Sequence, residues 1–372
     1  MNLTLLYQWI QIIEQHFTNL QKWQARGLAV FSYGVVLAQH CQSSKVAEAL
    51  AGYRRIPTLE RGLRRWLANP RININACFEV WVGWVWASCH LPRAVLLVDE
   101  TKIADRLGVM MVSLAFERRA IPLAWYCYRA NSEMDYPSQG QVLMVWGLLA
   151  RVLAVLPDDS RPLVQMDRGL GHSSAMLKAL QNLGVAYQVR VQRSATLRSR
   201  RGHCSALHHL VKPGEYVTCH GTLFKGTRGV KVTVHLIWQP AYHEPWCLVT
   251  NDRRIPGSAY ALRVWQEESF RDLKSGGWQW QCTYVTTPAH AHRLILVLAV
   301  AYAWMLTQGT FVFQADVAVQ REVFEGRTNK YSLFRTGLRF FKRMVCVHPA
   351  NIVMGLCFAP PHHPVFAKVS SP

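Results

Sequence analysis

Acidic residues are scarce in this sequence, and several patterns that would place it in a common class are missing. Its 372 residues include 22 Asp and Glu against 42 Lys and Arg, which gives a formal net charge of +20. Ten cysteines are scattered without a CxxC pair, and no internal repeat or low-complexity tract occurs. The excess of basic residues favours a polyanionic partner, with nucleic acid ahead of an anionic membrane surface. The length allows one main domain with one or two smaller modules.

Long hydrophobic runs are also missing, although half of the residues are hydrophobic. The longest run, Leu294–Leu306, is shorter than the roughly 20 residues that span a bilayer, and His292 and Arg293 precede it. It therefore predicts a buried core helix. The N-terminus has neither a basic start nor a small-residue cleavage site, so we expect no secretion signal. Together these features favour a cytoplasmic protein with reduced thiols and no membrane partner.

Two residue types are plentiful enough to need an explanation. Most of the fourteen tryptophans must lie in the core, which leaves a few to stack on bases or to line a groove. One group of histidines and cysteines leaves a zinc site open as an alternative, although its spacing fits no closed tetrahedral pattern. This group comprises His203, Cys204, His208, His209, Cys219 and His220.

Residues 1–90 are predicted to form a helical, basic DNA-binding region. Amphipathic stretches cover 3–18, 27–50 and 58–68, and Thr58 is the expected N-cap of the third. Three arginines in the third helix form one basic stripe that could sit on DNA phosphates. An ordinary solvated surface helix is the alternative. The arginines of this stripe are Arg61, Arg64 and Arg65.

Residues 93–191 show strands alternating with helices. The order is strand, strand, strand, helix, strand, helix, strand, which predicts a mixed α/β sheet. Asp99 ends the apolar segment AVLLV and Asp167 ends PLVQM. Ligands collect at the carboxyl ends of adjacent strands, and a buried unpaired carboxylate there is costly unless a metal or a partner neutralises it. A strand-end turn or a helix N-cap is the alternative role for each aspartate.

Residues 192–257 are predicted to be an inserted, mostly β subdomain. Its entry loop, RSATLRSRRGH, is basic and includes Arg198, Arg200 and Arg201. After it comes the segment YALRVWQEESFRDLK, then an apolar helix over 288–307. A basic tail follows that includes RTNKYSLFRTGLRFFKRM. We expect the β insert and both basic segments to contribute to nucleic-acid binding through their charge.

Polar side chains in the segment 260–274 are spaced so that a helix would present them together. At about 100° per residue, four of them fall inside an arc of roughly 60°. They are Tyr260, Arg263, Glu267 and Lys274. Leu262, Trp265 and Leu273 project from the opposite, apolar side, which can pack against a core. The alternative is an ordinary amphipathic helix with an Arg263–Glu267 ion pair. Glu267 and the two strand-end aspartates would together suit Mg²⁺.

The sequence resembles a known family at these positions. VDET around Asp99, MDRG around Asp167, and the Tyr260–Lys274 box are similar to insertion-sequence DDE transposases, in the branch named for its tyrosine-arginine-glutamate-lysine signature. The similarity covers roughly residues 54–307. It implies a ribonuclease-H-like mixed sheet, as in retroviral integrases, with an inserted β subdomain and flanking helical regions. The implied division is a catalytic core in two parts, an insert between them, and a basic C-terminal region. These are residues 91–191, 258–307, 192–257 and 308–372.

The resemblance also implies roles for individual residues. Asp99, Asp167 and Glu267 would form a DDE triad that binds two Mg²⁺ or Mn²⁺ ions. Glu268 is a neighbouring competitor that projects about 100° away from Glu267 on a regular helix. The remaining implied roles concern DNA. Tyr260, Arg263 and Lys274 would hold backbone phosphates, and Arg271 is a further candidate contact. Arg168 would contact phosphate or pair with a carboxylate.

A flipped base could stack on a tryptophan of the β insert. Trp246 has the matching position in PWCLVTN, with Trp238 as an alternative, and simple packing in the insert would explain either residue equally well. The basic tail has no motif that matches the family. Its role in binding transposon ends or in dimerisation therefore rests on charge alone.

The function implied by the resemblance is cut-and-paste DNA transposition. The protein would cleave DNA at transposon ends in a metal-dependent reaction, through hairpin ends, and would join the 3′-hydroxyl to target DNA. Its partners would be the terminal inverted repeats and target DNA, with a homodimer in the synaptic complex, in the cytoplasm at the bacterial nucleoid. One alternative is a metal-dependent DNA nuclease without strand transfer. Another is a non-catalytic DNA-binding protein derived from a transposase.

Overall fold

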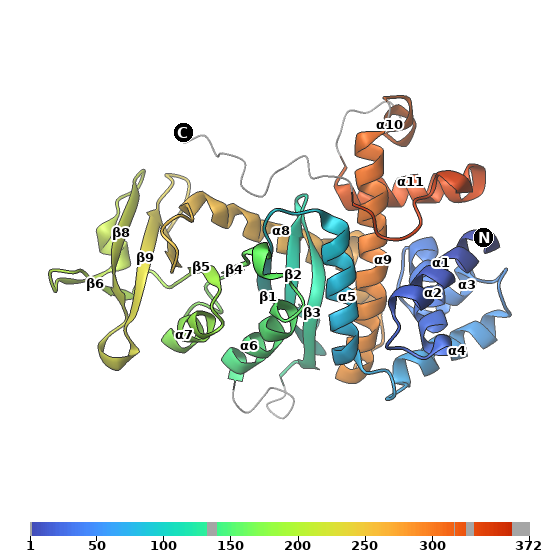
Figure 1. Ribbon diagram of the computed structural model, residues 1–372, viewed down its shortest axis with the longest axis horizontal. Coiled ribbons are helices and arrows are strands. Elements are labelled where there is room, and N and C mark those ends of the chain that lie inside the picture. The colour runs from blue at the N-terminus through green and yellow to red at the C-terminus, as the bar shows by residue number, and fades with distance from the viewer. Residues whose placement is uncertain (1, 132–139, 316, 325–330, 359–372) are drawn as a thin grey trace.

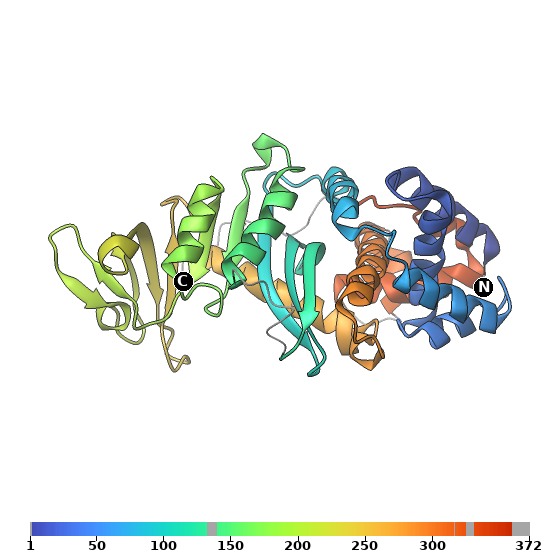
Figure 2. The same cartoon turned by 90° about the horizontal axis from the view of Figure 1, so that it is seen from below.

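A computed structural model describes residues 2–131, 140–315, 317–324 and 331–358. The fold is mixed α/β, as predicted, with one sheet of ten strands and flanking helices. The strand order is β3-β2-β1-β4-β5-β10-β9-β8-β6-β7. Figures 1 and 2 show the sheet running lengthwise, with the N-terminal helices beyond one end and strands β6, β8 and β9 at the other.

The N-terminal region forms five helices, but their bounds differ from the predicted ones in two places. The stretch predicted over 27–50 is two helices, because Gln39 adopts a left-handed conformation (φ 49°) and ends the first. Thr58 is not an N-cap: the helix begins at Ile56 with Arg55 as its N-cap, and Pro57 lies in its first turn, where a missing N–H is tolerated. The Trp-rich segment is the fifth helix. The bounds are α1 Leu3–His16, α2 Lys22–Ala38, α3 Ser43–Ala49, α4 Ile56–Ala68 and α5 Ile74–Cys89.

The first five strands form the half of the sheet nearest to the N-terminal helices. Strands β1, β2 and β3 form an antiparallel meander, and β4 and β5 add to β1 in parallel. β2 is buried along its whole length, which explains its nearly continuous apolar sequence. The bounds are β1 Val95–Ile103, β2 Leu107–Phe116, β3 Arg119–Arg129, β4 Leu163–Met166 and β5 Ala186–Arg190.

The segment predicted as an insert contributes the other five strands. Its last strand, β10, pairs with β5 in antiparallel fashion, so the segment extends the central sheet and does not form a sheet of its own. The bounds are β6 Thr196–Arg198, β7 Cys204–Ala206, β8 Tyr216–Leu223, β9 Val230–Ile237 and β10 Trp246–Thr250.

The remaining helices cover the sheet and connect it to the N-terminal region. Figures 1 and 2 both place α9 between the sheet and helices α1 to α4. The bounds are α6 Gly140–Leu153, α7 Ser174–Asn182, α8 Val264–Arg271, α9 Pro288–Gln314, α10 Val317–Phe324 and α11 Leu333–Val347. Single 3₁₀ turns cover Asp158–Ser160, Leu207–Leu210, Gly226–Arg228, Gly257–Arg263, Trp280–Cys282 and Pro349–Asn351, and a π-helical turn covers Asp272–Gly276.

Helix α9 is the core helix that the apolar run predicts, but it is longer than the predicted 288–307. By length and composition alone it could cross a membrane, yet 94% of its most apolar window is buried inside the protein. Trp304 on α9 stacks on Trp9 of α1 with ring centroids 4.1 Å apart, and both side chains are fully buried. Arg293 donates to the main-chain carbonyl of Leu67, 2.8 Å away. These contacts fix the N-terminal helices to α9. In the basic tail, residues 325–330 and 359–372 lie outside the described residues.

Candidate active site

The two predicted aspartates lie side by side on neighbouring parallel strands, but only Asp167 follows the end of its strand. Asp99 lies within β1, which continues to Ile103, so the prediction that it ends a strand is wrong. β1 and β4 are parallel neighbours with Val98 opposite Met166, so Asp99 and Asp167, the next residue of each chain segment, lie at the same level. Asp99 is buried, whereas the Asp167 side chain is 40% exposed. The apolar residues that precede both carboxylates are buried in the core and thereby fix the level of the carboxylates along the two strands.

The segment that carries Tyr260, Arg263, Glu267 and Lys274 is not the single regular α-helix that the sequence predicts. It starts as a 3₁₀ turn, continues as α8, and ends in the π-helical turn Asp272–Gly276. Within that turn Lys274 departs from helical geometry, with φ −86° and ψ −118°. Turns of this kind are frequent at helix ends and at functional sites. The four side chains nevertheless all turn toward the ends of β1 and β4.

Arg263 lies at the centre of the three predicted catalytic acids. Its Nη2 atom is 2.9 Å from Asp99 Oδ2 and 4.0 Å from Asp167 Oδ2, and its Nη1 atom is 3.1 Å from Glu267 Oε1. The Arg263–Glu267 ion pair is thus present, but as one arm of a larger cluster. Three carboxylates from distant parts of the chain converge on one buried guanidinium.

Exposure and charge are graded across this cluster. Burial raises the pKa of Asp99 to about 6, against the opposing effect of Arg263, and the Asp167 carboxylate adds to the rise. The Glu267 side chain is 63% exposed. One guanidinium therefore lies among three carboxyl groups, of which one is shielded from water and two are open to it. Such a site is suited to a further cation or to a partner that supplies one.

Tyr260 and Lys274 are hydrogen-bonded to residues of β4 and β1, respectively. The Tyr260 hydroxyl donates to the main-chain oxygen of Met166, 3.1 Å away, and burial raises its pKa. Lys274 Nζ donates to Thr101 Oγ1 at 2.7 Å. Burial lowers the pKa of Lys274, while the Asp99 carboxylate raises it. A phosphate contact by either residue stays a prediction, and for Tyr260 it would require the single hydroxyl proton to leave Met166.

The other predicted contacts near the site are engaged with carboxylates. Glu268 turns away from the cluster, 3.8 Å from Arg119 and 3.0 Å from Arg271. Of the two roles considered for Arg168, contact with phosphate or pairing with a carboxylate, this structure shows the pairing. Arg168 Nη1 is 2.6 Å from Glu244 Oε1. Glu244 also accepts from Arg190 at 2.9 Å. No sequence signal had marked Glu244 or Arg190.

A pocket of about 570 Å³ opens beside the acids. Asp167, Glu267 and Arg263 line one side, and Trp246 and Arg190 line another. The Trp246 ring is stacked on Tyr242 with centroids 5.4 Å apart, and the Tyr260 ring meets it edge-on at 5.6 Å. Trp238, the alternative in the sequence analysis, is not among the residues that line this pocket. Its indole N–H is bonded to the Tyr242 carbonyl.

The predicted basic residues outside this edge lie in two other places. Arg198 and Arg200, with Lys231 and Arg253, line a separate pocket of about 410 Å³. β10 runs antiparallel to β5, so Arg253, which follows β10, lies at the opposite end of the strands from Asp167. The pocket that Arg253 lines is therefore at the other end of the strands from the acids. Arg201 is exposed in the same loop. The stripe on α4 is also exposed, and one of its members is paired at 2.6 Å with Glu60. The stripe comprises Arg61, Arg64 and Arg65, and Arg64 is the paired residue.

A second charged cluster on the α8 segment was missed by the sequence analysis. Asp272 is buried and accepts from Arg119 Nε at 2.6 Å and from the Tyr302 hydroxyl at 3.2 Å. That hydroxyl also lies 3.1 Å from Ser269 Oγ. The signal was available: on a regular helix Asp272 projects at about 120° from Tyr260, which places a carboxylate on the apolar side beside Trp265.

The donor types at the main cluster fit a hard divalent cation, because carboxylate oxygens are the ligands that Mg²⁺ and Mn²⁺ prefer. The guanidinium of Arg263 is positioned between these oxygens and acts as a stand-in cation. Among the described residues, no group of three or more His, Cys, Asp or Glu side chains is arranged to hold a metal ion as it stands. This holds for the histidine and cysteine group at which a zinc site was left open as an alternative, and for the three acids around Arg263.

Comparison with known proteins adds little. No protein-family model and no curated protein matches the sequence. Among solved structures, the chain is similar to the C-terminal lobe of a budding yeast Argonaute, with 12% identity over 77% of this chain and 62% of that chain. The TM-score of that similarity is 0.22, which is too low to support an argument about function.

Proposed function

We propose that this protein is a metal-dependent DNA transposase with a ribonuclease-H-like core. It would cleave DNA at transposon ends and transfer the 3′-hydroxyl into target DNA. The observation that carries the proposal is the convergence of Asp99, Asp167 and Glu267 on one guanidinium, with the two aspartates side by side on parallel neighbouring strands. The net charge of +20 agrees with a nucleic-acid partner.

The three carboxylates would hold two Mg²⁺ or Mn²⁺ ions after Arg263 leaves their centre. Bound ions would activate a water or a 3′-hydroxyl and stabilise the leaving oxygen of phosphoryl transfer. Arg263 would exchange its carboxylate partners for a backbone phosphate, to which a guanidinium can donate two parallel hydrogen bonds. Lys274, held by Thr101 beside Asp99, would add a positive charge at the same strand end.

The proposal extends to the division of labour along the chain. Residues 91–191 and 258–307 would form the catalytic core, and 192–257 would be the β insert that contacts DNA through Arg198, Arg200 and Arg201. The helical region 1–90 would bind the terminal inverted repeats. A homodimer would hold both ends in the synaptic complex at the bacterial nucleoid, since cut-and-paste joining needs two ends together.

The test uses isosteric variants of the acids. Asp99→Asn, Asp167→Asn and Glu267→Gln should each lower Mg²⁺-dependent cleavage at least about 1,000-fold, a loss of about 4 kcal/mol in transition-state stabilisation. The substrate is DNA that flanks the coding region and carries its inverted repeats, together with a pre-cut form that ends in a 3′-hydroxyl. Cleavage and joining to a target plasmid are measured on gels, and binding is measured separately.

Glu268→Gln is the matched control, because Glu268 is the adjacent carboxylate but pairs with Arg119 and Arg271. It should keep at least a third of wild-type cleavage. Full cleavage by an acid variant would remove that residue from the site. Cleavage by the wild type without joining would leave a nuclease, and tight DNA binding without either reaction would leave a non-catalytic DNA-binding protein.

A further inference from the structure

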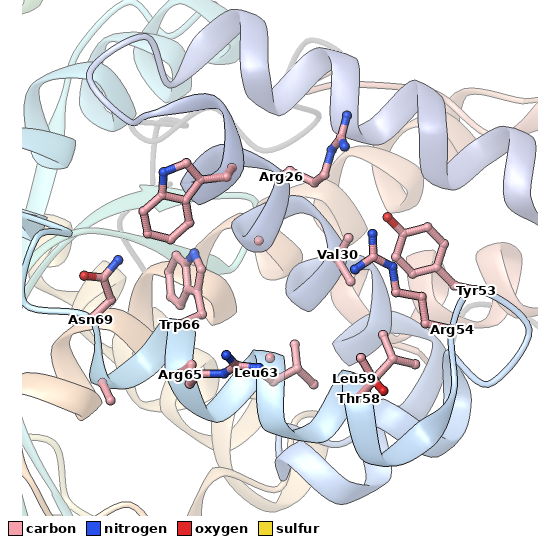
Figure 3. Close-up of a pocket in the computed structure, with 14 residues that line it drawn as sticks. Arg26, Val30, Tyr53, Arg54, Thr58, Leu59, Leu63, Arg65, Trp66 and Asn69 are labelled. Carbon is pink, nitrogen blue, oxygen red and sulfur yellow. The ribbon is translucent and has the colours of Figure 1, made fainter.

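A groove of about 690 Å³ lies between α2 and α4, in the N-terminal region. Figure 3 shows it bounded by Arg26 on one side and by the α4 residues Thr58, Leu63 and Arg65 on the other. The sheet lies beyond α5 and α9, so this groove is separate from the three acids (Figure 1). None of the roles given above to the arginines of α4 explains a cavity beside them.

The floor of the groove is apolar and firmly held. Trp66 is buried, and its indole N–H donates to the main-chain oxygen of Gln24 at 2.9 Å. A Cβ atom at Gly27 would come within 2.3 Å of the Trp66 ring, so only glycine lets α2 approach the indole this closely. On the opposite helix, a Cβ at Gly62 would meet nothing within 4 Å, which leaves that side of the groove open.

Exposed aromatic surface borders this floor. Trp23 is 54% exposed although it is one of the largest apolar side chains, and its indole N–H donates to Gln21 Oε1, which fixes the ring. Tyr53 is partly buried at the other end of the groove, beside Arg54 (Figure 3). A planar ligand that enters the groove therefore meets aromatic rings whose positions are already set.

The rim is positively charged. Arg26, Arg54 and Arg65 line the groove, and no acidic side chain does. Glu14 reaches Arg26 only at 3.6 Å from outside the lining. The exposed stripe of α4 continues this charge around the helix, where Arg61 and Arg65 line a neighbouring hollow. A ligand with an aromatic body and flanking negative charges matches this arrangement.

One polar group in the lining lacks a partner. The Asn69 Nδ2 atom makes no hydrogen bond, while Asn69 Oδ1 accepts from the main-chain nitrogen of Arg71 at 3.0 Å. The oxygen is thus fixed, and the Nδ2 atom is buried, so the amide would have to turn before a ligand in the groove could reach it. Figure 3 shows Asn69 next to Trp66 at one end of the groove. A carbonyl oxygen or ring nitrogen of a ligand is the complementary acceptor.

We propose that this groove binds the base of an unpaired nucleotide in DNA, with its flanking phosphates on Arg26, Arg54 and Arg65. The inference rests on the proposed function in that the partner is DNA, but it concerns a different site. Bases inside a duplex already stack on both faces, so an aromatic-lined groove favours a base that is frayed, bulged or single-stranded.

The groove is tested by filling it and by removing its exposed ring. In Gly62→Leu the new side chain projects into open space, and the substitution raises helix propensity, so the fold is retained. Trp23→Ala removes the exposed indole. The full chain is titrated in EDTA with three labelled DNAs: a blunt duplex, the same duplex with one unpaired nucleotide, and a single strand. Each variant should bind the two DNAs with unpaired bases about ten-fold more weakly, and the duplex less than two-fold more weakly.

Matched controls come from α6. Trp146 is a tryptophan with 41% exposure, and a Cβ at Gly147 also meets nothing within 4 Å. Trp146→Ala and Gly147→Leu should bind all three DNAs as the wild type does. An equal loss on duplex and unpaired DNA would overturn the proposal and leave a backbone contact only. Unchanged binding by Gly62→Leu would remove the groove from DNA binding altogether.

The result is independent of catalysis. Asp99→Asn should keep the preference for unpaired DNA, because the groove is remote from that carboxylate. If the acid variants cleave normally while the preference holds, the proposed function fails and the groove stands. If cleavage depends on the acids but no preference for unpaired DNA is found, the groove alone fails.

Discussion

Two arginines contact carboxylates of the same helical segment in this protein, and they do so in different ways. Arg119, which begins β3, pairs with Asp272 at 2.6 Å and lies 3.8 Å from Glu268. Arg263, which precedes α8, is surrounded by three carboxylates. Both guanidinium side chains are 9% exposed, so burial does not distinguish the two clusters.

What distinguishes them is the completeness of each network. Asp272 receives hydrogen bonds from Arg119 and Tyr302, and the hydroxyl of Ser269 contacts both Tyr302 and the main-chain N–H of Ala120. At Arg263 the acids outnumber the base, Nε has no partner, and a pocket opens alongside. A closed buried network joins elements together. A buried network with unbalanced charge and access to solvent is a candidate for binding and catalysis.

Breaking the closed network should have the largest effect on stability. Asp272→Ala leaves Arg119 buried without its main partner, and we expect a loss of about 3–5 kcal/mol in the free energy of unfolding. Urea denaturation followed by circular dichroism measures it. Replacing both residues, as Arg119→Met with Asp272→Leu, should recover most of the loss because no charge stays buried. A loss below about 1 kcal/mol for Asp272→Ala would show that the network is not structural.

The open cluster should respond differently to loss of its arginine. Arg263→Ala should destabilise the protein less than Asp272→Ala does, because water reaches Asp167 and Glu267. The same change should raise the affinity for Mn²⁺ about ten-fold, since the competing cation is gone. Isothermal titration calorimetry in the absence of DNA measures this affinity. Arg271→Ala is the control, and weaker Mn²⁺ binding by Arg263→Ala than by this control would contradict the stand-in role of Arg263.

A partly buried histidine beside a like charge, Arg293, gives a baseline for both clusters. Burial, helped by Arg293, lowers the pKa of His292 to about 4, from 6.5. The unfolded chain therefore takes up a proton at higher pH than the folded chain does. Stability should be full above pH 6.5 and should fall by about 3 kcal/mol as the pH drops to 4. In His292→Gln, unfolding curves across this range should lack that part of the pH dependence.

Much of the site could be predicted because it depends on local patterns. An apolar run followed by an acid marked Asp99 and Asp167 as candidates, and the alternation of elements predicted a mixed sheet. The parallel pairing of their strands was not predicted. The spacing of Arg263 and Glu267 survives because one helical turn separates them. The grouping of the three acids into one site was implied by the resemblance to a family and not by local spacing.

The features that sequence reasoning missed depend on distant partners. The π-helical turn at Lys274 cannot be derived from spacing, because it accompanies the contacts of Asp272 with Arg119 and Tyr302 from two other elements. The pairing of Arg168 with Glu244 joins two residues that are separated in the sequence by five strands, β5 to β9. Thr58 failed as an N-cap because Pro57 suits the first turn of a helix, which moves the start to Ile56.

The ladder between β5 and β10 has a mechanical consequence. Leu248, Val249 and Thr250 are hydrogen-bonded across to the strand that neighbours β4, so the far strands share one continuous backbone framework with the strand that ends at Asp167. Rotation of those far strands as a separate rigid unit would break the hydrogen bonds of this ladder. The distance between Asp167 and Arg198 is therefore fixed by the sheet. A double helix that contacts both residues must bend to fit the protein.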